Sequence, residues 1–144
     1  MNRILLVIFA VAAFACASHR AVRDEFLLIP GRKPPRDARV SPIASVHQGG
    51  NLCTQEVSYK GHQFNIDRTC GQPKITYVQS FDESFATPEG VSVGDPIAKA
   101  ISAGGVLHQR ECEVVLPSRW TAHGTGGDCS TAKIVYLDLQ RDGA

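Results

Sequence analysis

The chain has 144 residues, and its 15 Lys and Arg nearly balance its 14 Asp and Glu, which leaves a formal net charge of +1. This balance excludes the strong basic surplus typical of nucleic-acid-binding proteins, so we expect no nucleic-acid partner. The length fits one domain with a single modest hydrophobic core.

A secretory signal peptide is predicted for residues 1–17. The segment starts with Asn2 and Arg3 and continues with an unbroken apolar run at residues 4–14. A membrane-spanning helix needs about 20 apolar residues, so this shorter run fits a signal peptide better. We therefore expect an exported protein, either periplasmic or secreted.

Cys16 gives this segment a second interpretation. Cleavage before Cys16 and cleavage before Ser18 both satisfy the small-x-small rule. The first site would leave Cys16 at the new N-terminus, in a segment that distantly resembles the lipidation signal of bacterial lipoproteins. The departure is Ala13, which stands where those proteins usually carry Leu. Lipidation at Cys16 would make the protein an outer-membrane lipoprotein.

Residues 18–50 form a basic, Pro-containing N-terminal arm in our interpretation. This stretch contains six Lys or Arg, three acidic residues and four prolines. The composition is typical of a solvated, partly extended tether, and attraction to an anionic membrane surface is the alternative. An apolar patch at residues 26–29 is the exception, because it would either add an edge strand or bind another molecule.

Two cysteine pairs dominate the rest of the chain. Cys53 and Cys70 are 17 positions apart, and so are Cys112 and Cys129. A Lys-Ile-x-Tyr stretch follows each pair, and every matching position keeps the same offset along the chain. With Cys16 removed or acylated, four cysteines remain, which allow three connectivities, and our hypothesis is a disulfide within each pair. The spacing does not match a structural four-cysteine zinc site.

A β-hairpin is predicted within the first cysteine pair. Gly61 and His62 fit a two-residue type II′ turn, in which Gly occupies the position with positive φ. This register places Tyr59 opposite Phe64 and sets the two cysteines opposite each other. One arrangement would therefore satisfy the turn, the core and the disulfide together.

A further half-buried strand is predicted for residues 74–81, where apolar and polar residues alternate. A short helix should follow at residues 96–103. Asp95 is its expected N-cap and Pro96 its expected first helical residue.

The second cysteine pair should hold strands at residues 111–116 and 132–139. Their connection at residues 117–127 looks like a long loop, which would break the repeat. The predicted fold class is therefore α+β and mainly β, with duplicated, disulfide-braced antiparallel β units and one short helix. The β-rich domain would span residues 51–140.

The loop at residues 117–127 is the predicted binding site. It carries the only tryptophan of the chain, and disulfide-bonded cysteines would flank it. Trp and Arg dominate the energetics of protein interfaces, so Arg119, Trp120 and His123 are the candidate contact residues. The alternative is that Trp120 folds back against the core.

Catalytic and cofactor chemistry have no comparable candidate. No serine stands in a Gly-x-Ser-x-Gly elbow, and four cysteines are assigned to disulfides. The histidines at positions 47, 62, 108 and 123 show no ligand spacing on one element. We therefore expect no enzyme, no cofactor and no metal site.

Residues 90–139 resemble half of a β-lactamase-inhibitor-protein repeat and are also similar to the small outer-membrane assembly lipoproteins. The likeness rests on a Gly-led turn at residues 90–95, a short helix, a glycine stop and two cysteines around a long loop. Asp95 and Pro96 depart from the Met-Thr of the family turn. The resemblance implies a binding module of the cell envelope.

The expected function is an exported protein-binding module, of which an inhibitor or an immunity-type protein would be examples. Its partner would be another exported protein. The alternative is a structural envelope lipoprotein anchored through Cys16. Membrane contact is expected only in that case.

Overall fold

The computed structural model describes residues 28–47, 49–108, 112–125 and 128–140. The predicted signal peptide with Cys16 and the first part of the arm lie outside these ranges. Among the described residues there is no helix with the length and apolarity that a bilayer span requires.

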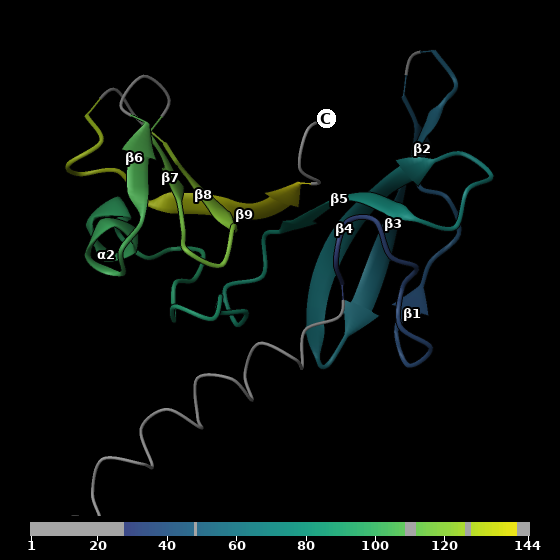
Figure 1. Cartoon of the computed structure of the whole chain (residues 1–144), viewed down its shortest axis with the longest axis horizontal. Coiled ribbons are helices and arrows are strands. Elements are labelled where there is room, and N and C mark those ends of the chain that lie inside the picture. The colour runs from purple at the N-terminus through teal and green to yellow at the C-terminus, as the bar shows by residue number, and fades with distance from the viewer. Residues whose placement is uncertain (1–27, 48, 109–111, 126–127, 141–144) are drawn as a thin grey trace, which may run out of the picture.

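One open antiparallel sheet contains all the strands of the described chain (Figure 1). In chain order the elements are β1 (Arg39–Val40), β2 (Ser45–Val46), β3 (Leu52–Tyr59), β4 (His62–Thr69), β5 (Ile75–Ser80), α2 (Ile97–Ser102), β6 (Val106–His108), β7 (Glu113–Val115), β8 (Thr121–Gly124) and β9 (Ile134–Gln140). The strands lie in the order β1-β3-β4-β5-β9-β8-β7-β6, and β2 also pairs with β3. The predicted class, mainly β with one short helix, is confirmed.

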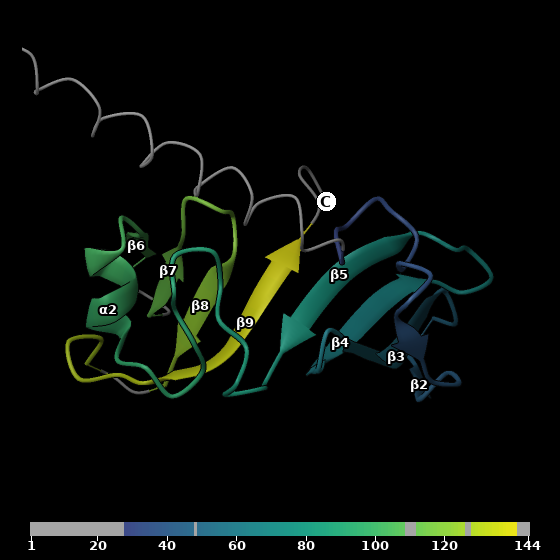
Figure 2. The same cartoon turned by 90° about the horizontal axis from the view of Figure 1, so that it is seen from below.

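The two halves of the sheet meet at the β5–β9 pair (Figure 2). Strand β5 begins at Ile75 and β9 begins at Ile134, and these two isoleucines are matching positions of the sequence repeat. Gln79 and Asp138 are also matching positions, and they lie directly opposite each other. A pseudo-two-fold axis therefore passes between Gln79 and Asp138 and relates β3-β4-β5 to β7-β8-β9.

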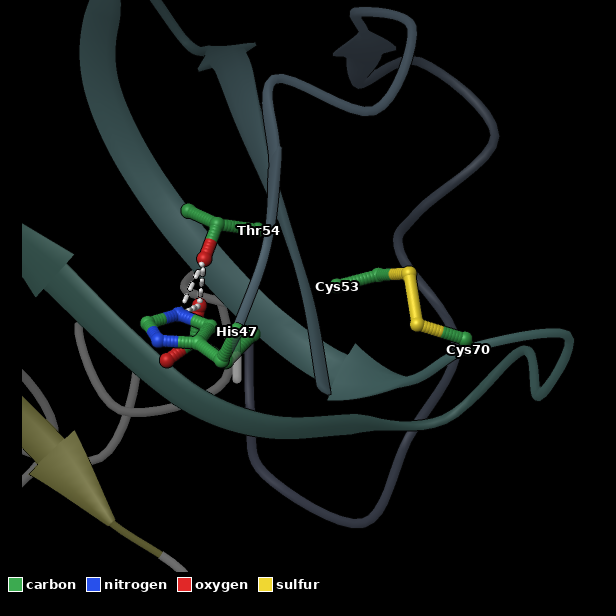
Figure 3. The surroundings of a disulfide bond; sticks show 5 residues. His47, Cys53, Thr54 and Cys70 are labelled. Carbon is green, nitrogen blue, oxygen red and sulfur yellow. Dashed lines mark hydrogen bonds and ion pairs between the residues drawn. A yellow bond between two sulfur atoms is a disulfide. The ribbon is translucent and has the colours of Figure 1, made fainter. Parts of the chain in front are cut away.

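Both predicted disulfides are present. Cys53 is bonded to Cys70 and Cys112 to Cys129, with a Cα–Cα distance of 5.1 Å in each case. Figure 3 shows the first of them beside the β3–β4 hairpin. Each disulfide ties the start of an outer strand, β3 or β7, to the chain that leaves the next strand. The repeated spacing in the sequence thus reflects repeated structure.

The register of the first hairpin differs from the predicted one. Tyr59 lies opposite His62, and Lys60 and Gly61 form the turn with φ values of 50° and 84°. Positive φ at both positions is the requirement of a type I′ turn, so the predicted type II′ turn is wrong. The strand slides by two residues, which keeps every side chain on its predicted face. Cys53 therefore lies opposite Arg68 and not opposite its disulfide partner.

The second half repeats the hairpin that we expected to be broken. Thr121–Gly124 form β8, and Val115 lies opposite Thr121 across a short turn that contains Arg119 at φ 75°. The pairing with the central strand is also repeated. A bulge follows Asp67 in β4, and one follows His123 in β8. The prediction of a long loop at residues 117–127 is wrong, because the β7–β8 hairpin is three residues shorter between equivalent strand pairs than the β3–β4 hairpin, and the connection from β8 to β9 is three residues longer.

The hydrophobic core lies on one face of the sheet. Strand residues that point to this face are Val57, Phe64, Ile66, Val78, Val114, Ala122 and Leu137. The connection between β5 and α2 adds Phe85 and Val91, and α2 adds Ile97 and Ala100. A Cβ at Gly124 would lie only 2.7 Å from Cγ1 of Ile97, so this glycine lets α2 pack closely against β8.

Helix α2 begins differently from our expectation. Pro96 is the N-cap, and the cap has no side-chain hydrogen bond. The Asp95 carboxylate instead accepts hydrogen bonds from the Ser92 amide at 2.8 Å and from Lys99 Nζ at 2.7 Å. Asp95 thus stabilises the approach turn and the helix side chain rather than the first helical amides.

The arm is part of the fold from residue 28 onward. Leu28 is fully buried in the core, and β1 and β2 both pair with β3. The Gly31 amide donates to the Ile75 carbonyl, and the Ile75 amide donates to the Arg32 carbonyl. The expected boundary at residue 50 therefore does not separate a tether from the domain.

Candidate functional site

The predicted contact residues do not form one exposed surface. Trp120 is 2% exposed, and its ring centroid lies 5.1 Å from that of Phe85 in the core. Arg119 is exposed in the β7–β8 turn, and the side chain of His123 is 12% exposed. The alternative interpretation, in which Trp120 folds against the core, is the one that the structure has. A binding role for Arg119 or His123 stays a prediction.

The face of the sheet opposite the core is polar in its middle strands, with Val106 and Val115 toward one edge, and we call it the open face. Seven residues lie directly opposite one another across seven strands and therefore point to this face: Val106, Val115, Thr121, Asp138, Gln79, Asn65 and Glu56. None of them belongs to the hydrophobic core cluster. The described sheet thus keeps a continuous ladder of side chains outside its core.

A buried carboxylate occupies the centre of the open face. Asp138 is 2% exposed and lies beside the pseudo-two-fold axis. Its Oδ2 accepts a hydrogen bond from the Tyr77 hydroxyl at 3.0 Å and lies 2.9 Å from His123 Nε2. Its Oδ1 is buried without a hydrogen-bond partner among the described residues. Each half of the sheet therefore supplies one donor, and one acceptor remains unsatisfied.

His123 bridges two carboxylates on the open face. Its Nδ1 lies 2.8 Å from Oε1 of Glu113, and its ring stacks on Tyr136 with centroids 4.2 Å apart. Burial disfavours the imidazolium, but the hydrogen bond and charge of Asp138, with the charge of Glu113, outweigh it. The pKa of His123 is therefore raised above its ordinary value of 6.5.

Tyr77 remains a neutral donor in this cluster. Burial raises the pKa of the Tyr77 hydroxyl far above its ordinary range, and the charge and hydrogen bond of Asp138 raise it further. With His123 protonated and Tyr77 neutral, Glu113 and Asp138 leave the cluster with one excess negative charge.

The first half carries an equivalent but chemically different group. Asp67 lies between Thr54 and Tyr77 in the ladder, as His123 lies between Glu113 and Tyr136. The Thr54 hydroxyl donates to Oδ1 of Asp67 at 2.5 Å and lies 2.9 Å from Nε2 of His47 (Figure 3). An acidic residue in one half thus takes the place of the histidine in the other.

A groove opens beside β3 and β4 on the open face. It has a volume of about 550 Å³ and is lined by Glu56, Gln63, Phe64, Asn65, Phe81 and Asp82. A second hollow of about 230 Å³ shares Glu56 and Gln63 with it and extends toward β1. Phe81 is 54% exposed, and its ring centroid lies 5.7 Å from that of Tyr136. The groove therefore combines carboxylate, amide and aromatic groups.

Asp82 at this groove is held ionised. The hydrogen bond from Ser84 lowers the pKa of Asp82 to about 2, and the amides of Gln63 and Ser84 and the nearby His62 contribute, against a cost from burial. Nδ1 of His62 lies 3.0 Å from the Ser84 hydroxyl. That hydroxyl donates to Asp82 at 2.6 Å, so its proton is directed to the carboxylate and not to the imidazole. Ser84, His62 and Asp82 are therefore not arranged as a catalytic triad, in which the hydroxyl donates to the histidine and the histidine donates to the acid.

Metal ligation has no candidate in the described ranges. No group of three or more His, Cys, Asp or Glu side chains there is placed to hold an ion. Both nitrogens of His123 are already directed at carboxylates.

Comparisons with protein-family models, with curated proteins and with solved structures found no match for this chain. The resemblance to β-lactamase-inhibitor proteins and small assembly lipoproteins therefore stays a prediction. The site described above is argued from its geometry alone.

Sequence reasoning missed Asp138, Tyr77 and Gln79. The constant offset of the repeat does relate Gln79 to Asp138, but it does not show that equivalent strands pair with each other. Only that pairing places both residues at the centre of the sheet. The sequence thus indicates the repeat, but it does not indicate that β5 and β9 pair around a pseudo-two-fold axis.

Proposed function

We propose that the protein is an exported protein-binding module that engages its partner on the open face of the sheet. The observation that carries this proposal is the part of the ladder that is polar, which crosses five neighbouring strands from Thr121 to Glu56 and has at its centre a buried carboxylate oxygen without a hydrogen-bond partner among the described residues. Two disulfides brace the β3–β4 and β7–β8 hairpins of this sheet, which favours its use as a preformed platform. An inhibitor or an immunity-type protein would use such a platform.

Two features support export and binding together. Disulfides persist in oxidising compartments, so the two bonds indicate a protein that works outside the cytosol, in the periplasm or after secretion. Preformed polar and aromatic groups on a rigid element lower the entropic cost of association. The open face has such groups in the groove and around Tyr136.

The test is a matched pair of glutamine substitutions. Gln79→Arg changes the centre of the open face, whereas Gln72→Arg introduces the same side chain into an exposed turn. The oxidised, exported protein is immobilised, partners from envelope and secreted extracts are identified by mass spectrometry, and the affinity of the purified partner is measured by calorimetry.

We expect Gln79→Arg to weaken partner binding at least ten-fold and Gln72→Arg to change it less than two-fold. Circular dichroism would establish that both variants keep the fold. Equal affinities for the two folded variants would contradict a binding surface on the open face.

A further inference from the structure

We propose that the open face accepts a basic, extended segment of the partner protein, with a lysine or arginine side chain of that segment in the groove beside Glu56. This inference rests on the proposed function and names the chemistry of the partner. It follows from charge, from the groove and from the unsatisfied oxygen of Asp138.

The charge of the open face favours a cationic partner. Its acidic residues are Glu56, Asp67, Glu113 and Asp138. Among Lys and Arg, the described strands place only Arg39 there, at the edge, and His123 adds a positive charge when protonated. Residues 28–144 as a whole are balanced, with twelve Lys or Arg against twelve Asp or Glu, so the acidic character belongs to the open face and not to the whole domain. Complementary charge increases both the association rate and the specificity of such a contact.

The groove has the groups that bind an ammonium or guanidinium head. Asp82 stays ionised throughout the physiological range, and the Glu56 carboxylate makes no ion pair within the described residues. The exposed ring of Phe81 offers a face for a cation–π contact. The amide oxygen of Asn65 adds a hydrogen-bond acceptor, whereas that of Gln63 already accepts a bond from the Ser58 hydroxyl at 2.9 Å. A cationic side chain would gain a favourable charge interaction with both carboxylates, which a neutral or acidic side chain would not.

Asp138 is an independent sign of a missing donor. A buried carboxylate oxygen without a partner is costly, because it has lost its water and gained no hydrogen bond. Thr121 and Gln79, which flank Asp138 in the ladder, are only half-buried. Because Oδ1 of Asp138 is itself buried, a donor from the partner would reach it only by displacing the side chains of these two residues on binding.

The spacing of the two anchor points defines the partner segment. Glu56 and Asp138 are separated by three strand steps in the ladder, which corresponds to roughly 14 Å at about 4.8 Å per step. An extended chain covers this distance in about four residues, and residues four apart point to the same side. The partner segment should therefore carry two cations at positions i and i+4.

The experiment uses a fluorescein-labelled decapeptide rich in Thr and Val, with lysines at its third and seventh positions. Its matched control carries acetyl-lysine at both positions, which keeps the length and removes the charge. Fluorescence anisotropy with the oxidised, exported protein at low salt gives the affinities. We expect the acetylated peptide to bind at least ten-fold more weakly.

Two protein variants locate the contact. Glu56→Gln removes a carboxylate that lines the groove, and Glu83→Gln removes an exposed carboxylate that does not line it. We expect Glu56→Gln to weaken peptide binding about ten-fold and Glu83→Gln to change it less than two-fold. Equal binding of the two peptides, or equal effects of the two variants, would overturn the inference.

The partner identified by capture separates this inference from the proposed function. If Gln79→Arg weakens that partner but Glu56→Gln leaves it unchanged, the basic-segment inference fails and the binding module stands. If Gln79→Arg leaves the partner unchanged, the proposed function itself fails. Unfolding curves of each variant would show that a loss of binding is not a loss of fold.

Discussion

The two halves of the sheet share a scaffold but differ in what closes the core and in what lies on the open face. Each half has three strands in the same order, a bulge in its middle strand and a disulfide with a sequence separation of 17. The arm with Leu28 contributes to the core beside the first half, and α2 contributes beside the second. The comparison indicates that the repeated strands, bulges and disulfides form the scaffold. The elements that differ between the halves determine which side chains cover the core and which lie on the open face.

The helix packs on the second half at a position that has no side chain. Gly124 follows the bulge in β8, and Arg68 follows the equivalent bulge in β4. The absence of a side chain at Gly124 allows Ile97 to approach the strand, whereas an arginine would occupy that space. The half covered by the helix thus has a glycine where the half closed by the arm has an arginine.

The largest expected effect on stability comes from replacing Trp120 by alanine. Trp120 is the only tryptophan of the chain and lies in the second half, so the first half has no equivalent residue. Trp120 is buried against Phe85, so Trp120→Ala should lower the free energy of unfolding by about 3–5 kcal/mol. Urea unfolding followed by circular dichroism measures this loss.

Glu83→Ala is the control, because the Glu83 side chain is exposed. A surface substitution of this kind should change stability by about 0.5 kcal/mol or less. A stable, folded Trp120→Ala protein would contradict the core assignment and would restore the original contact hypothesis.

Removing either disulfide should come next in size and should show how alike the halves are. The two bonds close loops of equal length, so the chain-entropy model assigns about 3 kcal/mol to each. We expect the Cys53→Ala/Cys70→Ala and Cys112→Ala/Cys129→Ala proteins to lose similar stability. Thermal unfolding of the two double variants beside the oxidised parent measures the two losses. Because equal loops predict equal losses, a difference comparable to the whole contribution of one bond would show that the halves are not equivalent.

The cysteine pairs were predictable because their identical spacing and the shared stretch after each pair are visible in the sequence. The same spacing does not reveal how residues are distributed between turns. The β7–β8 hairpin is three residues shorter than the β3–β4 hairpin, and the following connection is three residues longer. The compensation leaves the cysteine spacing unchanged, which is why a strand at Thr121–Gly124 resembled a loop.

The hairpin register was wrong for a conformational reason. The prediction reserved positive φ for glycine, yet Lys60 adopts φ 50° and forms the turn with Gly61. The alternation of buried and exposed residues could not reveal the wrong register, because a shift of two residues leaves every side chain on the same face of the strand. The open-face site was harder still, since Asp138 becomes central only when β5 and β9 pair.

The smallest expected effect concerns His123, which stands where the first half has Asp67. Its pKa is raised in the folded protein, so the folded state binds this proton more tightly than the unfolded chain does. The resulting stabilisation is fully present below about pH 6.5 and is lost as the pH rises through the folded pKa. We therefore expect the free energy of unfolding to fall between pH 6 and pH 9, by less than in either of the comparisons above.

Urea unfolding across this range, with His123→Gln as the control, isolates the contribution of the imidazole. The variant should lack the pH-dependent part, because glutamine does not titrate. The titration of the His123 ring proton by NMR gives the direct value, and its midpoint should lie above 6.5. A midpoint below 6.5 would mean that burial outweighs Glu113 and Asp138, and the cluster would then hold a second uncompensated negative charge on the open face.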